Sequence, residues 1–232
     1  MLILSLDSTA SPASVCLYED DKLLADYYIN TGLTHSQTLM CMVESVLNVT
    51  GHKTADIDLF SVNNGPGSFT GVRIGVAAIK GMAYAADKSC VAVSTLESMA
   101  YNCLVYNGIV CACMDARRNQ VYNALFRITD GTVDRLCDDR AVSVDELLRE
   151  LIAVNEKTLL CGDGAALVYS SAKGNRLISL APANIRYQNA SSTAMAAMKK
   201  AHSGPVLSPA DLTPSYLRLS QAERELNNKK EG

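Results

Sequence analysis

An order of secondary-structure elements that occurs twice along the chain is the feature that most constrains the fold. In the first half, apolar runs bounded by turn residues predict three strands, and helical apolar spacing predicts a helix after them, with Thr34 and Gln37 in capping-box spacing. Further strands and helices complete the order βββαβαβα. The predicted elements are strands 2–6, 14–18 and 23–29, helix 34–50, strand 57–62, helix 68–87, strand 90–93 and a helix from 94 to about 103.

The second half repeats this order. Asp7 and Asp115 end the first strand of each half, 108 residues apart (115 − 7). A meander of strands followed by alternating helices and strands implies a mixed sheet with helices on its faces, formed twice. The predicted elements are strands 109–114, 121–128 and 133–137, a helix capped by Ser143, strand 159–161, helix 165–172, strand 177–180 and helix 192–202.

Two tandem units of this kind predict the fold class. The chain is expected to be α/β, with two ribonuclease-H-like βββαβαβα units in the actin/Hsp70/sugar-kinase (ASKHA) architecture, in which the cleft between the halves normally holds ATP. This analogy supports a fold and not an activity. We expect an N-terminal domain over 1–105, a C-terminal domain over 106–214, and a terminal segment over 215–232 with a short charged helix at 220–228.

Composition argues against several classes of function. Charged residues make up 19% of the chain, the net charge is −3, and no run of Lys and Arg exceeds two residues, which argues against nucleic-acid binding by this chain alone. The eight cysteines form no Cys-x-x-Cys pair, so we expect free thiols in a reducing cytosol. The N-terminus lacks the basic flank of a signal peptide, and no apolar run approaches the ~20 residues of a membrane helix. We therefore expect a soluble, cytoplasmic protein without membrane contact.

A glycine-rich loop, Asn63 to Gly75, leads into the predicted helix 68–87. Before Asp87 this helix carries only two charges, Arg73 and Lys80, and it has two apolar or small stripes at helical spacing. We expect one stripe to pack into the core of this chain and the other to pack against a partner protein. An anion cradle is the alternative, but the loop lacks the Gly-Lys-Ser/Thr ending of a P-loop. The stripe assigned to the partner is Gly71, Gly75, Ala78 and Met82.

Several short motifs point to one family. They are Leu6-Asp7-Ser8-Thr9, Leu33-Thr34-His35-Ser36, Gly65-Pro66-Gly67-Ser68-Phe69-Thr70-Gly71-Val72-Arg73-Ile74-Gly75 with Lys80-Gly81, Met114-Asp115-Ala116-Arg117-Arg118, and Pro214-Ser215-Tyr216-Leu217-Arg218. With these motifs the chain resembles the TsaB (also called YeaZ) family over nearly its whole length. The glycine block is the most specific of them.

The resemblance implies a noncatalytic subunit. Proteins of this family pair with TsaD, a related catalytic subunit that transfers a threonylcarbamoyl group to adenosine beside the tRNA anticodon, and the ATPase TsaE acts on that pair. The resemblance also implies a homodimer when the chain is isolated, and tRNA reached only through the complex. The implied contact is a bundle of helices 34–50 and 68–87, with interface residues His35, Leu39, Gly71, Arg73, Gly75, Ala78, Lys80 and Met82.

The resemblance bears on a metal site as well. The catalytic relative carries His-x-x-x-His on its first helix, and two imidazoles four residues apart can share a metal. Here His35 takes the first position, but Leu39 takes the second. We therefore expect no metal site. We also expect no catalytic residue, because Ser68 and the cysteines have no recognisable His or Asp partner.

Nucleotide binding stays open as a residual or shared contact. ASKHA ATPases place a glycine-bearing turn in each half, so that backbone N–H groups approach phosphate. The turns after Asp7 and Asp115 contain no glycine, and Arg117 and Arg118 would crowd phosphates in the second turn. We expect no firmly bound cofactor, and ATP or ADP contact only within the assembled complex. The residues for such a contact are Asp7, Ser8, Thr9, Gly162 and Gly164.

Two further questions stay open in the sequence. Arg117 and Arg118 suit contact with tRNA, contact with a partner carboxylate, or a solvated turn. The alternative function is an autonomous ATPase or an M22-type, glycoprotease-like metallopeptidase. Tyr216 and Arg218 are expected to tie the C-terminal segment to the body of the protein.

Overall fold

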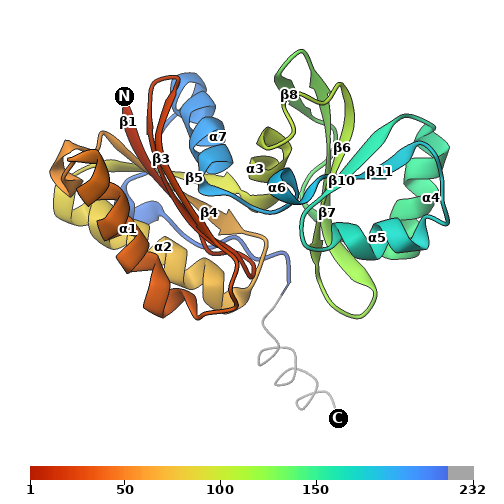
Figure 1. The fold of residues 1–232 in the computed structure, drawn as a ribbon, viewed down its shortest axis with the longest axis horizontal. Helices are drawn as coiled ribbons and strands as arrows, with labels where there is room; N and C mark the ends of the chain where they lie inside the picture. Colours follow the sequence, from red (N-terminus) through yellow and green to blue (C-terminus); the bar gives the residue numbers. More distant parts are fainter. Residues whose placement is uncertain (219–232) are drawn as a thin grey trace, which may run out of the picture.

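The structure consists of two lobes, each built on one mixed β-sheet (Figure 1). A computed structural model of the chain describes residues 1–218. The helix predicted at 220–228 lies outside the described residues. Within residues 1–218, every helix is too short or too polar to cross a bilayer.

The first lobe carries a five-stranded sheet in the order β3-β2-β1-β4-β5. Its first three strands form an antiparallel meander, and β4 and β5 run parallel to β1. The bounds are β1 Leu2–Asp7, β2 Ala13–Glu19, β3 Lys22–Ile29, α1 His35–Thr50, the 3₁₀ turn η1 Thr54–Asp56, β4 Leu59–Gly65, α2 Phe69–Ala86, β5 Ser89–Ser94 and α3 Thr95–Tyr101.

The second lobe repeats this topology, with strand order β11-β10-β6-β7-β8 and a short extra strand, β9, paired with β7. The tandem ribonuclease-H-like prediction is therefore confirmed, although the four-residue β9 was not predicted. The bounds are β6 Gly108–Asp115, β7 Gln120–Thr129, β8 Thr132–Arg135, β9 Arg140–Ser143, α4 Val144–Val154, β10 Thr158–Cys161, α5 Ala165–Ser171, β11 Ile178–Leu180, α6 Ala183–Arg186, α7 Ala190–Ser203 and the 3₁₀ turn η2 Pro209–Asp211.

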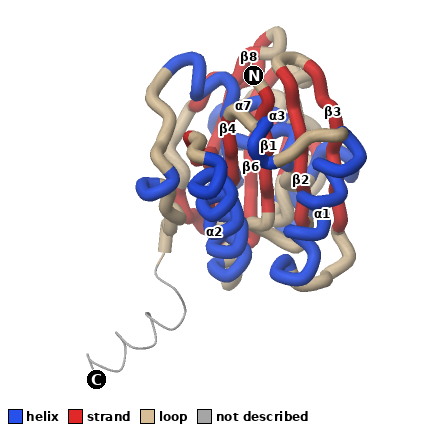
Figure 2. The backbone as a smooth tube through the Cα atoms, turned by 90° about the vertical axis from the view of Figure 1, so that its left-hand side faces the viewer, coloured by secondary structure: helices blue, strands red, loops and turns tan. Residues whose placement is uncertain are grey.

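The central strand β1 is buried along its whole length. A strand covered on both faces has an almost continuous apolar sequence rather than an alternating one, and Leu2 to Leu6 fits that pattern. Leu2, Leu4 and Leu6 pack into the core with α1 and α2, whereas Ile3 packs into the core on the opposite face. Helices α1 and α2 lie side by side over the outer face of this sheet (Figure 2).

The last helix of each predicted half packs on the sheet of the other lobe. Helix α7 lies on β1 and β2 of the first sheet, and α3 lies on β6 and β7 of the second. The two helices meet through small hydroxyl groups, with Ser98 Oγ 3.1 Å from both Ser192 Oγ and Thr193 Oγ1. The element order alone does not show which sheet a helix covers, so this exchange was not predicted. Because of it, one core cluster contains residues of both lobes.

Capping residues predicted the starts of three helices correctly, but only two of the three make the expected side-chain hydrogen bond. Ser94 and Ser143 cap α3 and α4, each accepting a hydrogen bond from the backbone N–H three residues later. Thr34 precedes α1 without a side-chain cap, and only its carbonyl accepts a bond from Gln37 N, at 3.0 Å. The capping box predicted at Thr34 is therefore wrong.

Candidate functional site

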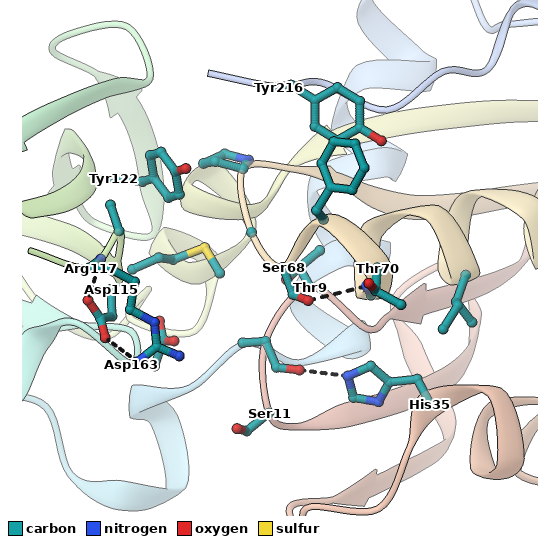
Figure 3. Close-up of a pocket in the computed structure, with 18 of the residues that line it drawn as sticks. Thr9, Ser11, His35, Ser68, Thr70, Asp115, Arg117, Tyr122, Asp163 and Tyr216 are labelled. Atoms are coloured by element: carbon teal, nitrogen blue, oxygen red, sulfur yellow. Dashed lines mark hydrogen bonds and ion pairs between the residues drawn. The ribbon is translucent and has the colours of Figure 1, made fainter. Parts of the chain in front are cut away.

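A cleft of about 670 Å³ separates the two lobes. Figure 3 shows that its two walls differ in character: the first lobe contributes mainly hydroxyl groups, and the second contributes charged side chains. The first wall includes Thr9, Ser11, His35, Ser68 and Thr70, and the second includes Asp115, Arg117, Tyr122 and Asp163.

Asp7 lies behind the cleft wall rather than in the cleft, and it is buried. Its Oδ1 accepts hydrogen bonds from the backbone N–H and the hydroxyl of Thr9, both at 2.8 Å, and its Oδ2 accepts from Asn63 Nδ2. Burial raises the pKa of the Asp7 carboxyl, although these hydrogen bonds oppose the shift. The polar groups of Asp7 and Thr9 hold the turn after β1 together, and their contact with a nucleotide stays a prediction.

Gly71 and Gly75 of α2 face the turn that follows β1. A Cβ at Gly71 would lie 2.0 Å from the carbonyl oxygen of Ser8, and a Cβ at Gly75 would lie 2.5 Å from Ser8 Oγ. Ser8 Oγ donates to the Gly71 carbonyl at 2.8 Å, so the hydroxyl proposed for nucleotide contact is also used by the fold. The assignment of Gly71 and Gly75 to the interface is therefore wrong, whereas contact of Ser8 with a nucleotide stays a prediction. Both glycines are needed because the chain's own turn crosses α2 at close range.

Two other predicted residues also lie inside the first lobe. Leu39 is 1% exposed and packs in the core of the first lobe, so its assignment to the interface is wrong. His35 is half-buried, and its Nε2 donates to the Ala10 carbonyl at 2.7 Å. Among residues 1–218, no group of three or more His, Cys, Asp or Glu side chains is placed to hold a metal ion.

Gly162 and Gly164 pack against β6 of their own lobe. A Cβ at Gly162 would lie 2.0 Å from the Cys113 carbonyl oxygen, and a Cβ at Gly164 would lie 2.8 Å from the Met114 carbonyl carbon. Gly164 N also donates to the Cys113 carbonyl at 3.0 Å. These two glycines therefore allow the turn after β10 to cross β6 closely. The structure gives them this packing role, and their contact with a nucleotide stays a prediction.

The hairpin between β6 and β7 carries the two predicted arginines. Arg117, Arg118 and Asn119 all have positive φ, at 65°, 55° and 56°, an unusual run for residues with a side chain. The Arg117 guanidinium pairs with Asp115 at 3.2 Å, and its backbone N–H donates to the same carboxylate at 2.7 Å. Both arginines are exposed, and Arg117, which lines the cleft, is bound to its own hairpin.

The outer faces of α1 and α2 expose large apolar side chains. Tyr84 on α2 is 79% exposed, Val49 on α1 is 76% exposed and Met40 on α1 is 48% exposed. Both helices begin at the cleft and pack against each other, so their outer faces form one surface. We define the docking face as the exposed residues of these helices. It comprises Ser36, Gln37, Met40, Cys41, Glu44, Asn48 and Val49 of α1, and Thr70, Arg73, Ala77, Gly81, Tyr84 and Ala85 of α2.

Among the predicted interface residues, Arg73 alone belongs to the docking face. Ala78 and Met82 are half-buried at its edge, and Lys80 Nζ is used within the chain, donating to the carbonyls of Ala210 at 2.8 Å and Leu212 at 3.4 Å. The small residues that face outward on α2 are Ala77, Gly81 and Ala85. A Cβ at Gly81 would meet nothing within 4 Å. The small residues predicted to meet a partner therefore lie on the buried or half-buried sides of α2, and contact of this helix with a partner stays a prediction.

Comparison with known proteins decides the family. A family model described as "TsaD: tRNA N6-adenosine threonylcarbamoyltransferase" matches residues 30–226. The "tRNA threonylcarbamoyladenosine biosynthesis protein TsaB" of Bacillus subtilis (strain 168) is 33% identical over 167 residues, which are 72% of this chain and 73% of that protein. The chain belongs to the TsaB family. The TsaB protein of Escherichia coli (strain K12) agrees, with 34% identity over 65% of either chain.

Solved structures share the fold of this TsaB-family chain. The structure described as "YeaZ from Pseudomonas aeruginosa" has a TM-score of 0.80 and 24% identity, covering 93% of this chain and 99% of that chain. A second Pseudomonas aeruginosa structure, of an uncharacterized protein with similarity to peptidase YEAZ, has a TM-score of 0.81 at 24% identity, over 94% of this chain and 99% of that one. The predicted TsaB resemblance and the ASKHA fold class are both confirmed.

Sequence reasoning missed several residues that connect the C-terminal segment to the lobes. Asn64, Phe69 and Gln120 each contact residues between Thr213 and Arg218. The glycine at position 65 was a local sequence signal for these contacts. In the structure its φ is 125°, a backbone conformation that favours glycine. The predicted tie through Tyr216 and Arg218 is confirmed.

Proposed function

We propose that this TsaB-family chain is a noncatalytic subunit of a tRNA threonylcarbamoyladenosine synthesis complex, and that it pairs with a TsaD-like catalytic subunit through the docking face. One observation carries the proposal: Met40, Val49 and Tyr84 are exposed on two adjacent helices. Large apolar side chains exposed on neighbouring helices are typical of an interface, because burying them removes apolar area from water at ~25 cal/mol per Å².

The match of a TsaD family model to residues 30–226 supports a related fold in the partner. A related fold offers the same pair of helices, so two such faces can pack as a pseudo-symmetric helical bundle. The same argument applies to a second copy of this chain, which accounts for a homodimer when the partner is absent. In the proposal the TsaE-like ATPase and tRNA are reached through that complex in the cytoplasm.

The internal bonds of the first lobe support a noncatalytic role. The oxygens of Asp7 accept hydrogen bonds from the chain itself, and His35 Nε2 is bound to the Ala10 carbonyl. A catalytic carboxylate or imidazole needs an accessible atom within hydrogen-bond reach of substrate. Contact with ATP or ADP stays part of the proposal only for the assembled complex.

The substitution Gly81→Trp tests the docking face. Gly81 is exposed, and a Cβ there meets nothing, so the isolated chain should fold as the wild type does. The indole would hold a partner helix away, and co-elution with TsaD on size-exclusion chromatography should be lost. The matched control is Ala166→Trp, on the exposed side of α5 in the second lobe, which should leave co-elution intact.

Unchanged co-elution of the Gly81→Trp chain would place the interface elsewhere. The rival function, an autonomous ATPase or metallopeptidase, is tested by titration calorimetry of the isolated chain with ATP and with zinc. Stoichiometric binding of either, together with turnover, would support that rival and overturn the noncatalytic role.

A further inference from the structure

The segment after α7 runs back along the first lobe and then crosses to the second. Leu207 forms an antiparallel bridge with Cys90, with both backbone bonds at 2.8 Å. Lys80 then holds the carbonyls of Ala210 and Leu212, and Leu212 is buried in the first core. The next six residues, Thr213–Arg218, are here named the strap. Residues 215–218 of the strap line the cleft.

One end of the strap is fixed to the first lobe by its backbone. Ser215 N donates to the Asn64 carbonyl at 2.7 Å, and Asn64 Nδ2 donates to the Thr213 carbonyl at 3.0 Å. The strap passes so close to β4 that a Cβ at Gly65 would lie 2.2 Å from the Ser215 carbonyl oxygen. This end of the strap is therefore fixed to the C-terminal end of β4 by two hydrogen bonds.

Tyr216 attaches the strap to the start of α2. Its ring stacks on Phe69, with the ring centroids 4.6 Å apart and the planes 24° apart, and its hydroxyl accepts a bond from Arg73 Nε at 2.7 Å. The Arg73 guanidinium in turn lies 3.8 Å from the Phe69 ring centroid. Stacking of aromatic rings and of a guanidinium on a ring favours one geometry of the group.

Arg218 attaches the other end of the strap to the second lobe. Its guanidinium donates to the Ala116 carbonyl at 3.3 Å and to Gln120 Oε1, and it lies 5.6 Å from the Tyr122 ring centroid. Ala116 and Gln120 are the two ends of the β6–β7 hairpin, joined by a backbone bond of 3.0 Å. A forked guanidinium that reaches both ends at once holds the hairpin at a defined distance from the strap.

We propose that the strap is a clasp that fixes the opening of the cleft, with Arg218 as its attachment to the second lobe. The strap is bonded to β4 and α2 on one side of the cleft and to the β6–β7 hairpin on the other. Two lobes around a cleft commonly move by hinge motions about a few connecting residues. The strap connects the two sides of the cleft a second time, beside the packing of α3 and α7, and so opposes such motion. This inference is independent of partner docking, since it concerns the isolated chain.

The substitution Arg218→Ala tests the clasp in the full-length chain. Hydrogen exchange of the hairpin amides 116–120 should become about tenfold faster, because a hydrogen bond from a charged group is lost and local opening becomes easier. Single-molecule energy transfer between labels on exposed Cys41 in the first lobe and on Ser170→Cys in the second should change from one narrow distribution to a broad one.

The matched control is Arg176→Ala, an exposed arginine of the second lobe without a side-chain hydrogen bond to any residue among 1–218. It should leave both measurements unchanged. Gln120→Ala removes the acceptor from the opposite side and should reproduce the effect of Arg218→Ala, with no further change in the double variant. If Arg218→Ala fails to fold, Gln120→Ala decides alone. Unchanged exchange and an unchanged narrow distribution, or an equal effect of Arg176→Ala, would refute the clasp.

Discussion

At the scale of single residues, Asp7 shows how a position that suggests catalysis can be structural. The carboxylate ends the first strand of its half, as Asp115 does in the second, but it is buried and its oxygens accept three hydrogen bonds. Asn63 Oδ1, next to it, has no hydrogen-bond partner among the described residues. An uncharged amide at position 7 could therefore accept from Thr9 and donate to a flipped Asn63.

We predict that Asp7→Asn folds and is more stable than the wild type at neutral pH. Burial raises the pKa of Asp7 in the folded chain above its ordinary value of 3.8. In the pH window between the ordinary pKa and the raised pKa, the folded chain therefore holds the proton more tightly than the unfolded chain. Wild-type stability therefore falls as pH rises through that window, by about 1.4 kcal/mol for each pH unit, whereas the Asp7→Asn variant loses nothing.

Urea denaturation at a series of pH values measures this difference. The difference in free energy of unfolding between Asp7→Asn and the wild type should grow as pH rises through this window, and it should stay constant at higher pH. The control is Asp134→Asn on the exposed side of β8, which should show no such growth. A destabilised Asp7→Asn chain at pH 7 would mean that the ionised carboxylate stabilises the fold.

At the scale of elements, α2 has glycines with opposite roles on its two sides. Gly71 and Gly75 face the turn after β1, where the chain passes too close for any side chain. Gly81 faces outward, where a side chain has room. Helical spacing predicts that two sides of α2 are apolar or small, but it does not say which side the protein's own chain covers.

We predict opposite effects of alanine at two of these glycines. Gly71→Ala should lower the free energy of unfolding by ~2 kcal/mol, because the Ser8 backbone would have to move away from the new Cβ. Gly81→Ala should raise it by ~0.5–1 kcal/mol, because alanine loses less conformational entropy in a helix. Thermal or urea unfolding of the two variants measures both changes in the free energy of unfolding. Equal effects at both sites would contradict the packing described for Gly71.

At the scale of the whole molecule, the exchange of α3 and α7 joins the two lobes into one folding unit. Helix α3 follows the strands of the first lobe but covers an apolar sheet face of the second. Helix α7 follows the strands of the second lobe but covers an apolar sheet face of the first. The first sheet without α7 would expose the face formed around Ile3 and Cys16. The strap adds a second connection at the cleft.

We therefore predict that the fragment 1–105 does not fold by itself. Without α7 its exposed apolar face should bind a hydrophobic dye, and the fragment should aggregate. The same fragment fused through a linker to 186–204 should not aggregate and should show native far-ultraviolet dichroism. The intact chain should unfold in urea in one transition, with equal midpoints by dichroism and by tyrosine fluorescence. Two separate transitions would mean that the lobes fold independently.

The sequence by itself determined the order of strands and helices, the two ribonuclease-H-like units and the TsaB resemblance. Those depend on local periodicity, on turn residues and on motif spacing, all of which can be read along the chain. Residues that pair through space were harder to predict, and the hydrogen bonds of Asp7 and the strap contacts of Asn64 and Gln120 were missed.

Only the tertiary structure decided which face of α2 is free, where α3 and α7 pack, and what Asp7 and the glycines do. A glycine that allows a partner helix to approach and a glycine that allows the chain's own turn to approach have the same sequence signature, because both simply lack a Cβ. Long-range packing of the turn after β1 against α2 is what separates the two, and it leaves Ala77, Gly81 and Tyr84 on the exposed side of α2.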